Sequence, residues 1–291
     1  MKPAPFEYHA PESLDEAARL LSELGFGAKV IAGGQSLAPM LALRLAVFDH
    51  VIDLRRIPAL REIERQPDTL RLGGMVTQAA IEDSDEVAEG APLLSQATPL
   101  IGHFQIRSRG TIGGSIAHAD PAAEYPAVAL ALDATLDAHS VRGTRTLAAS
   151  EFFTGTWMTA LEEDEILTGV SVPVAGPRSG FAIEEFTRRH GDFAIAGAAI
   201  AVGVDAGGAI ERARIALFGL GSTPVRASEA EASVVGLRAE EMKAEEIAER
   251  AVANLDEIPS DLHGSSDFRR RIGATMTARA WQRAIEEACR A

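Results

Sequence analysis

Apolar and polar positions alternate along the first 55 or so residues in a way that predicts a small α/β unit. Residues 13–16 (Ser-Leu-Asp-Glu) have the pattern of a capping box, and the apolar spacing after them predicts a helix that ends near Gly25. Short apolar runs at 29–31 and 51–54 predict buried strands, and a helix is expected between them over 39–46. Helix and strand therefore alternate, as in a layered α/β arrangement.

The middle of the chain predicts a mostly antiparallel α+β unit. Its expected strands lie at 60–63, 69–72, 135–138, 144–147 and 165–172, and its expected helices lie at 87–98 and from Pro121 to about 132. The strand over 165–172 alternates apolar and polar residues, as a half-buried strand does, and Pro173 closes it.

The proline- and glycine-containing stretch 173–177 is the expected domain boundary. Beyond it, strands are expected at 181–187, 194–204 and 209–218, and helices at 227–235, 243–255 and 268–290. Gly207-Gly208 is expected to turn the last two strands into a hairpin. The predicted fold class is α+β. The predicted domains are 1–175, with subdomains of about 1–57 and 58–175, and 176–291, which consists of a three-stranded antiparallel sheet and a three-helix bundle.

Composition and charge narrow the function classes. Hydrophobic residues make up 46% of the 291 residues, which is a globular balance. A net charge of -14 argues against a nucleic-acid partner, because such binding depends on clustered Lys and Arg. The first ten residues lack the pattern of a signal peptide, and the longest apolar run, 194–204, is too short to span a membrane. A cytoplasmic protein without a membrane span is expected.

The first expected strand leads directly into a glycine pair, in the segment Ala32-Gly33-Gly34-Gln35-Ser36-Leu37. Glycine lets the backbone adopt unusual dihedral angles and approach a ligand closely, and backbone N–H groups at such a turn suit an anionic diphosphate. A glycine pair is equally typical of a plain tight turn. The spacing fits neither G-x-G-x-x-G nor the P-loop, which disfavours a nicotinamide-binding Rossmann site and an NTPase.

A second segment, Thr111-Ile112-Gly113-Gly114-Ser115, repeats this small-Gly-Gly-small chemistry in a chain that has no other repeat. Two such loops could clamp the two phosphates of one dinucleotide. Two unrelated tight turns would give the same pattern, so the residues alone leave both interpretations open.

Four longer segments carry a family resemblance. They are residues 29–40 (KVIAGGQSLAPM), 102–121 (GHFQIRSRGTIGGSIAHADP), 187–194 (TRRHGDFA) and 261–270 (DLHGSSDFRR). Together they resemble the flavin-binding medium subunit of the carbon monoxide dehydrogenase type, which belongs to the xanthine-oxidase family of molybdenum hydroxylases. The resemblance covers nearly the whole chain in the family's order.

The resemblance implies an FAD-binding domain of two α/β subdomains, like that of the PCMH and vanillyl-alcohol-oxidase proteins, followed by a CO-dehydrogenase-flavoprotein-like domain. Both glycine segments would hold the FAD pyrophosphate, and Phe193 would shield one face of the flavin ring. The residues implied to bind FAD are Lys29, Ala32, Gly33, Gly34, Gln35, Ser36, Leu37, Ile101, Thr111, Gly113, Gly114, Ser115, His118, Asp120, Glu124, Leu167 and Phe193.

The implied function is electron transfer within an oxidoreductase complex. A large molybdopterin subunit would act on the substrate, and a small subunit with two [2Fe–2S] clusters would pass electrons to FAD in this chain. The external acceptor would be a quinone, NAD or dioxygen, and the assembly a dimer of heterotrimers. The one cysteine, Cys289, agrees with this, because a cluster needs several cysteines. Neither catalytic residues nor metal ligands are expected in this chain.

Two alternatives of other classes remain open: a stand-alone FAD-dependent oxidoreductase and a non-catalytic nucleotide-binding module.

One departure from the family pattern bears on the flavin. Some relatives carry a lysine close to Glu184 and Glu185, where a cation would stabilise the anionic reduced flavin. Arg188 or Arg189 could supply that charge here, or both could simply be solvated.

Other polar residues are expected to have no chemical role. None of the seven histidines has a metal-binding spacing. The carboxylates at 162–165 and 240–241 are expected to form solvated faces. The basic run at 269–271 is expected to be solvated, with a subunit contact as the alternative.

Overall fold

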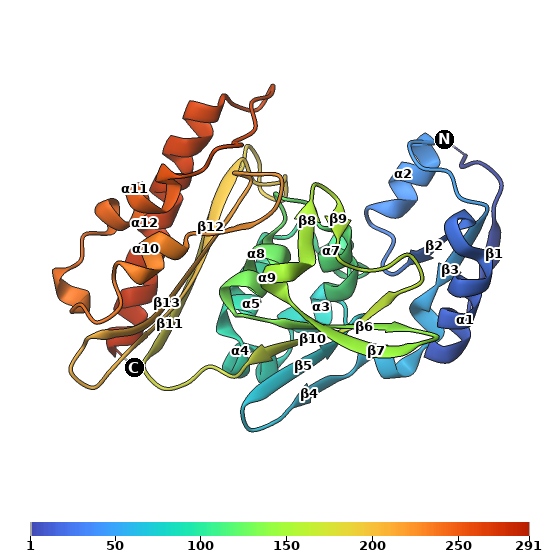
Figure 1. Cartoon of the computed structure of the whole chain (residues 1–291), viewed down its shortest axis with the longest axis horizontal. Coiled ribbons are helices and arrows are strands. Elements are labelled where there is room, and N and C mark those ends of the chain that lie inside the picture. The colour runs from blue at the N-terminus through green and yellow to red at the C-terminus, as the bar shows by residue number, and fades with distance from the viewer. Residues whose placement is uncertain (1, 291) are drawn as a thin grey trace.

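The computed structural model describes residues 2–290 and places three modules side by side along the long axis of the molecule (Figure 1). A small three-stranded sheet with its helices lies at the N-terminal end, a five-stranded sheet with short helices lies in the middle, and a four-stranded sheet with long helices lies at the C-terminal end. The α+β fold class is confirmed. The outer limits of the predicted domains, residues 1 and 291, lie outside the described residues.

The first module is a parallel sheet in the order β1-β3-β2. Ser13 caps the first helix, because its hydroxyl accepts a hydrogen bond from the Glu16 N–H at 3.2 Å. That helix packs Leu21 against Ile52 of the sheet. The polar strand β1 has no apolar run and was not predicted. The elements are β1 (Glu7–His9), α1 (Leu14–Leu24), η1 (Gly25–Gly27), β2 (Ala28–Ile31), α2 (Leu37–Leu43), β3 (His50–Asp53), η2 (Leu54–Arg56) and η3 (Pro58–Arg61).

The middle module is an antiparallel sheet in the order β4-β5-β10-β6-β7, with short helices packed on it. The helix predicted over 87–98 is two helices, because Pro92 begins a new one. The strands are β4 (Ile63–Arg65), β5 (Thr69–Gly73), β6 (Thr135–Ser140), β7 (Gly143–Ala148), β8 (Phe153–Gly155), β9 (Met158–Thr159) and β10 (Ile166–Pro173). The helices are α3 (Gln78–Glu82), α4 (Asp85–Gly90), α5 (Pro92–Ala97), η4 (Thr98–Leu100), α6 (Phe104–Arg107), α7 (Ile112–His118), α8 (Glu124–Ala131) and α9 (Ala149–Phe152).

The C-terminal sheet has the order β11-β12-β13-β14 and is antiparallel. The three predicted strands are confirmed, and a two-residue fourth strand extends the sheet. The Gly207-Gly208 turn is also confirmed, and Gly208 has a φ of +79°. The elements are β11 (Ser179–Phe186), β12 (Ala196–Val204), β13 (Ile210–Phe218), β14 (Val225–Arg226), α10 (Ser228–Ala232), η5 (Ala239–Glu241), α11 (Ala244–Ala253) and α12 (Ser266–Arg290).

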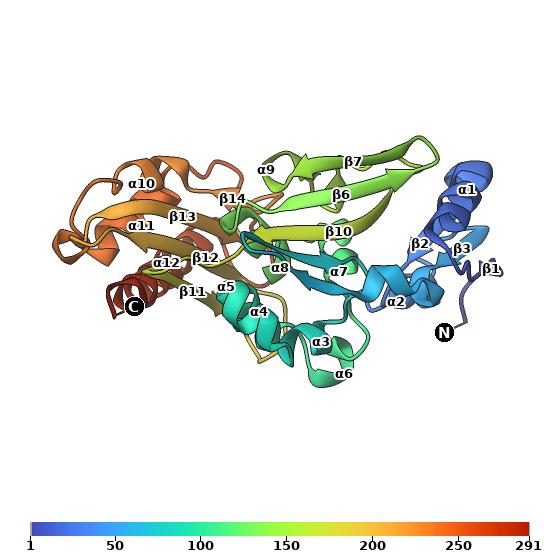
Figure 2. The same cartoon turned by 90° about the horizontal axis from the view of Figure 1, so that it is seen from below.

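Helices cover both faces of this sheet. Helix α12 packs on β11 and β12 from the outside, and α5 and α8 of the middle module contact the sheet from the inside (Figures 1 and 2). Strand β12 is therefore buried on both faces, which explains its unbroken apolar sequence. The outer helix approaches β11 so closely that a Cβ on Gly180 would lie 1.8 Å from the carbonyl oxygen of Ala284.

A buried charged cluster joins the C-terminal module to the middle one. The Arg226 guanidinium donates to both carboxylate oxygens of Glu231, at 2.6 and 2.7 Å. It also donates to the Asp133 carboxylate at 2.8 Å and to the carbonyl of Leu130 at 3.0 Å. Leu130 lies in the last turn of α8, and Asp133 lies just beyond that helix. Glu231 in turn accepts from the Ile215 N–H at 2.8 Å. The Arg226 side chain thus holds Glu231 of its own module in bidentate geometry and reaches the middle module through its hydrogen bonds to Asp133 and Leu130.

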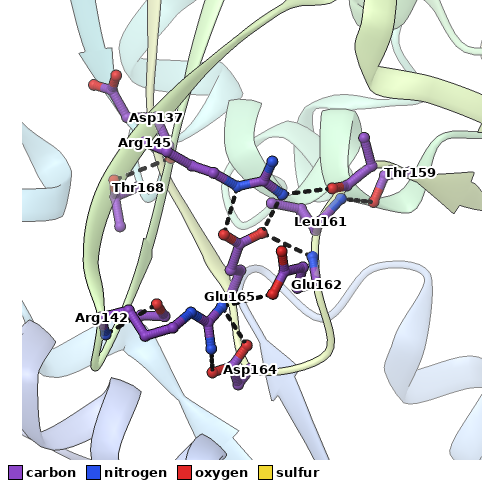
Figure 3. A network of polar contacts seen from close by, with 11 residues as sticks. Asp137, Arg142, Arg145, Thr159, Leu161, Glu162, Asp164, Glu165 and Thr168 are labelled. Carbon is purple, nitrogen blue, oxygen red and sulfur yellow. Dashed lines mark hydrogen bonds and ion pairs between the residues drawn. The ribbon is translucent and has the colours of Figure 1, made fainter.

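The acidic run at 162–165 is only partly the solvated face that was predicted, because its last residues belong to a network of ion pairs (Figure 3). Glu162 and Glu163 are exposed, as predicted. Glu165 is buried and binds both guanidinium nitrogens of Arg145, at 2.6 and 2.7 Å. Arg142 pairs with Glu162 and Asp164. The hydrogen bond from Arg145 holds the pKa of Glu165 below its ordinary value despite burial. Sequence reasoning missed these pairs because the arginines lie about twenty positions away on β7 and the turn before it.

Two of the three arginines in the basic run at 269–271 are not solvated as predicted, whereas Arg271 is exposed. Arg269 is buried and donates to the carbonyl of Ile195 at 2.6 Å and to both carboxylate oxygens of Asp261. Arg270 donates to carbonyls at the end of α11, including that of Leu255 at 2.6 Å. These arginines hold α12 against α11 and the C-terminal sheet.

Within residues 2–290, no helix combines the length and the apolar character needed to cross a membrane.

The Arg226 cluster generates a stability prediction. Arg226→Met should lower the free energy of unfolding by about 3 kcal/mol, because removing one partner leaves Glu231 buried without its counter-charge. Urea unfolding followed by circular dichroism measures this. Arg238→Met is the matched control, because Arg238 forms an exposed pair with Glu240, and it should leave the midpoint unchanged. Equal midpoints for both variants would contradict the prediction.

Candidate functional site

The turn between β2 and α2 presents a row of unused backbone donors. The successive N–H groups from Gly33 to Leu37 donate to no protein acceptor among the described residues. Gly34 has a φ of +75°, which suits glycine, and the Gln35 side-chain amide donates to the Gly33 carbonyl at 3.1 Å and braces the turn. Successive free amides form a concave anion site. The predicted phosphate-binding turn therefore has the donors that a diphosphate needs.

The glycines of this turn also serve contacts within the protein. A Cβ on Gly33 would lie 2.1 Å from the carbonyl oxygen of Arg109, so the turn rests directly on the chain just before α7. A Cβ on Gly114 would lie 3.3 Å from the Cβ of Ala32. The two glycine segments are therefore neighbours in space, as the phosphate-clamp interpretation requires. Close approach to a ligand is not the only reason for glycine at these positions.

The second glycine segment is the start of helix α7 rather than a loop, and its backbone donors are already occupied. The Thr111 hydroxyl accepts from the Gly114 N–H at 3.0 Å, and the Thr111 carbonyl accepts from the Ser115 N–H at 3.0 Å. The Ile112 and Gly113 N–H groups donate to carbonyls of the chain that follows β5. The two segments are thus not equivalent. The first offers amides, whereas the second supports it and offers the Ser115 hydroxyl.

Gly74 connects Leu167 to this helix. A Cβ on Gly74 would lie 2.6 Å from the Leu167 carbonyl oxygen, and the Gly74 carbonyl accepts from the Gly113 N–H at 3.1 Å. The backbone of Leu167, which was predicted to contact the cofactor, therefore reaches the second glycine segment only through Gly74. The Leu167 side chain lies in the hydrophobic core.

A tryptophan that sequence reasoning missed lies at the other end of α7. The Trp157 indole N–H donates to the Asp120 carboxylate at 3.2 Å, and its ring stacks on His118 with centroids 6.4 Å apart. Its side chain is 62% exposed, and its φ of +57° is unusual for a bulky residue. Burial lowers the pKa of His118, and the charge of Lys29 lowers it further, against the opposing charge of Asp120. No sequence signal placed Trp157 near the two predicted residues.

The connection between β11 and β12 brings Phe193 toward the Ile101 segment. A Cβ on Gly191 would lie 2.8 Å from the carbonyl oxygen of Gly102, and the rings of His103 and His190 are 6.0 Å apart. The Phe193 side chain is 61% exposed and available for a planar ligand. The C-terminal module thus contributes an aromatic residue to the rim of the site.

Two carboxyl groups, those of Glu124 and Glu185, have raised pKa values, and the charge of the first acts on the second. Glu124 is 5% exposed, and burial raises its pKa to about 7, with a further contribution from Asp120. Burial raises the pKa of Glu185 to about 8, and the charge of Glu124 adds to this shift. One oxygen of Glu185 is buried without a hydrogen-bond partner among the described residues. The raised pKa favours the protonated, uncharged form of Glu185 at neutral pH.

The neighbouring charges are neutralised or exposed. Glu184 pairs with Arg283 of α12. Arg188 and Arg189 are exposed and form no ion pair within the described part of the chain.

The site as a whole offers a row of amide donors for a diphosphate, aromatic rings for a planar group and carboxyl groups for hydroxyl or ring N–H donors. These residues fit a flavin dinucleotide.

Glu185 generates a pH prediction. A carboxyl group whose pKa is raised on folding stabilises the folded state fully below its unfolded pKa, and this stabilisation is lost as the pH rises through the folded value. The unfolding midpoint of the wild type should therefore fall between about pH 5 and pH 8. Glu185→Gln should flatten this decline, measured by thermal unfolding across that range. The control Glu240→Gln, at an exposed position, should not. Parallel curves for wild type and Glu185→Gln would contradict the assignment.

Comparison with known proteins identifies the family. Residues 4–175 match the FAD binding domain in molybdopterin dehydrogenase, and residues 181–284 match the CO dehydrogenase flavoprotein C-terminal domain. The chain is 40% identical to the 6-hydroxypseudooxynicotine dehydrogenase complex subunit alpha of Paenarthrobacter nicotinovorans, over 99% of this chain and 97% of that one. It is 39% identical to the carbon monoxide dehydrogenase medium chain of Hydrogenophaga pseudoflava, over 96% and 97%.

A solved structure shows the same architecture. The chain superposes on a chain of carbon monoxide dehydrogenase from Hydrogenophaga pseudoflava with a TM-score of 0.95 and 40% identity, covering 99% of each chain. The chain therefore belongs to the FAD-binding medium subunits of the molybdenum hydroxylases, of the carbon monoxide dehydrogenase type within the xanthine-oxidase family.

Proposed function

We propose that this chain takes electrons from the [2Fe–2S] clusters of a small subunit and passes them through its FAD to an external acceptor. The free amides between Gly33 and Leu37, held against the Arg109 segment, are the observation that carries the proposal. FAD supplies the ability to accept electrons singly and release them in pairs, while the protein binds and orients it. A large molybdopterin subunit would act on the substrate, and the complex would be a dimer of heterotrimers. The cytoplasmic location stays a prediction.

The residues proposed to bind FAD are those that the family resemblance implies, and the unused amides of the first turn support the assignment of the pyrophosphate. The first turn binds the pyrophosphate through its amides, Ser115 adds a hydroxyl, and the carboxyl groups at 120 and 124 accept from hydroxyl or ring N–H donors. The proposed FAD-binding residues are Lys29, Ala32, Gly33, Gly34, Gln35, Ser36, Leu37, Ile101, Thr111, Gly113, Gly114, Ser115, His118, Asp120, Glu124, Leu167 and Phe193. The proposed domains are 1–175 and 176–291, joined by the segment after β10.

The printed descriptions of the relatives support the partner assignment. Those at 40% and 39% identity are a subunit of a dehydrogenase complex and a medium chain. The single cysteine supports it further, because a chain with one thiol cannot ligate a cluster by itself.

The decisive experiment is to express the chain with its native partners and to record subunit composition, visible spectrum and metal content. We expect flavin absorbance in this chain, with iron and molybdenum in two co-purifying chains. A stand-alone oxidoreductase would instead purify alone with flavin and turn over a small organic substrate. A nucleotide-binding module would remain colourless after incubation with FAD, and that result would refute the proposal.

Gly33→Val tests the FAD cradle directly. The added side chain collides with the Arg109 carbonyl, so the first turn must move off its support, and we expect the flavin-to-protein ratio to fall at least tenfold. Gly203→Val is the matched control, because a Cβ there meets only Arg212 at 4.0 Å and the residue lies in strand β12. Circular dichroism establishes that both variants fold. A folded Gly33→Val that retains full flavin would exclude this cradle.

A further inference from the structure

Three side chains that sequence reasoning left without a role converge on the face of the first sheet. Strand β1 pairs in parallel with β3, with Glu7 opposite His50 and His9 opposite Ile52. Because alternate residues of a strand point to the same face, Glu7, His9 and His50 share one face. Tyr8 points to the other face, where its hydroxyl donates to Asp53 at 2.8 Å. The sheet pairing therefore brings together residues 41 positions apart.

The distances between the side-chain atoms are those of a ligand set. The rings of His9 and His50 share a hydrogen bond of 3.1 Å between Nε2 and Nδ1, which a bound metal ion would replace, and His50 Nδ1 is 3.6 Å from Glu7 Oε2. All three candidate ligand atoms lie within 4.8 Å of one another. Metal–ligand bonds of zinc arranged tetrahedrally place neighbouring ligand atoms roughly 3.3–3.5 Å apart. The two distances bracket this value, so small rotations of the side chains suffice to admit an ion.

The donor types select the class of metal. Two imidazole nitrogens and one carboxylate oxygen suit zinc and similar transition metals, whereas magnesium and calcium prefer oxygen ligands alone. The histidines are half-buried and Glu7 is exposed, so the set has a rigid inner side and an open outer side. The open side leaves the fourth coordination position to water.

We propose that Glu7, His9 and His50 form a binding site for a divalent transition metal of the zinc class, separate from the FAD cradle. The ion would clamp the short edge strand β1 to β3. That strand has only three residues. Besides its pairing with β3, it is held by a hydrogen bond from the Glu7 N–H to the Asp49 carbonyl at 2.8 Å. Since β3 also pairs with β2, which leads into the phosphate turn, the ion would stabilise the module that carries this turn.

Equilibrium titration of the chelator-treated full chain with Zn²⁺ and with Co²⁺ tests the site. We expect one ion per chain, visible absorption bands typical of Co²⁺ bound to nitrogen ligands, and a higher unfolding temperature with Zn²⁺. Loss of a residue that hydrogen-bonds to a metal ligand typically weakens metal binding roughly 10–100-fold. His50→Ala should weaken Zn²⁺ binding by more than this, because it removes a direct ligand. His9→Ala and Glu7→Gln should each weaken binding by at least tenfold.

His139→Ala is the matched control. His139 is also a half-buried histidine beside a carboxylate, with Nε2 3.5 Å from Asp15, but no second histidine lies within ligand distance of it in the described part of the chain. This variant should bind Zn²⁺ as the wild type does. The proposal is overturned if the wild type binds no Zn²⁺, or if His9→Ala and His50→Ala bind it as tightly as the wild type. Since the readout needs no flavin, failure of the FAD assignment would leave this result unaffected.

Discussion

The close approach of two backbones at Gly33 is the constraint on which the site depends. A side-chain carbon there would lie 2.1 Å from the Arg109 carbonyl oxygen, which no packed structure tolerates. The contact fixes the first turn, with its unused amides, against the segment that begins α7. The two segments have different tasks. The amides of α7 are consumed by Thr111, Val76 and Gly74, so α7 acts as a rigid support, and the first turn provides the anion donors.

The C-terminal module completes this site from a distance. Helices α5 and α8 of the middle module pack against its sheet, and Arg226 joins the two modules through Glu231 and Asp133. These contacts determine where the connection after β11 lies, and hence where Phe193 stands relative to Ile101. A loosened interface would move the aromatic side chain without touching the phosphate turn. In the proposed FAD site, binding of the phosphates and orientation of the ring system would therefore be separable properties of different modules.

The sequence predicted what depends on local patterns. Helix α1 was predicted from its cap and apolar spacing, and the strands β2, β10 and β13 from short apolar or alternating runs. The sequence did not predict features that depend on contacts between residues far apart in the chain. Strand β1 has no apolar run and exists because β3 offers a free edge. The pairing of Arg145 with Glu165, and the stacking of Trp157 on His118, join residues that no local pattern relates. The glycine segments were found, but only the structure separates the donor turn from the supporting helix.

The glutamate at position 185 changes the electrostatics less than its formal charge suggests. Two like unit charges about 4 Å apart repel each other by about 4 kcal/mol at an effective dielectric constant near 20, so a charged carboxylate beside a bound anionic flavin would disfavour that flavin. Burial and the charge of Glu124 raise the pKa of Glu185 to about 8, which favours the protonated form at neutral pH and so reduces that repulsion. The same proton provides a hydrogen-bond donor on a carboxyl group whose second oxygen has no partner among the described residues. A half-buried acid can thus stand close to where the family resemblance implies a lysine in some relatives, provided that its neighbours keep it neutral.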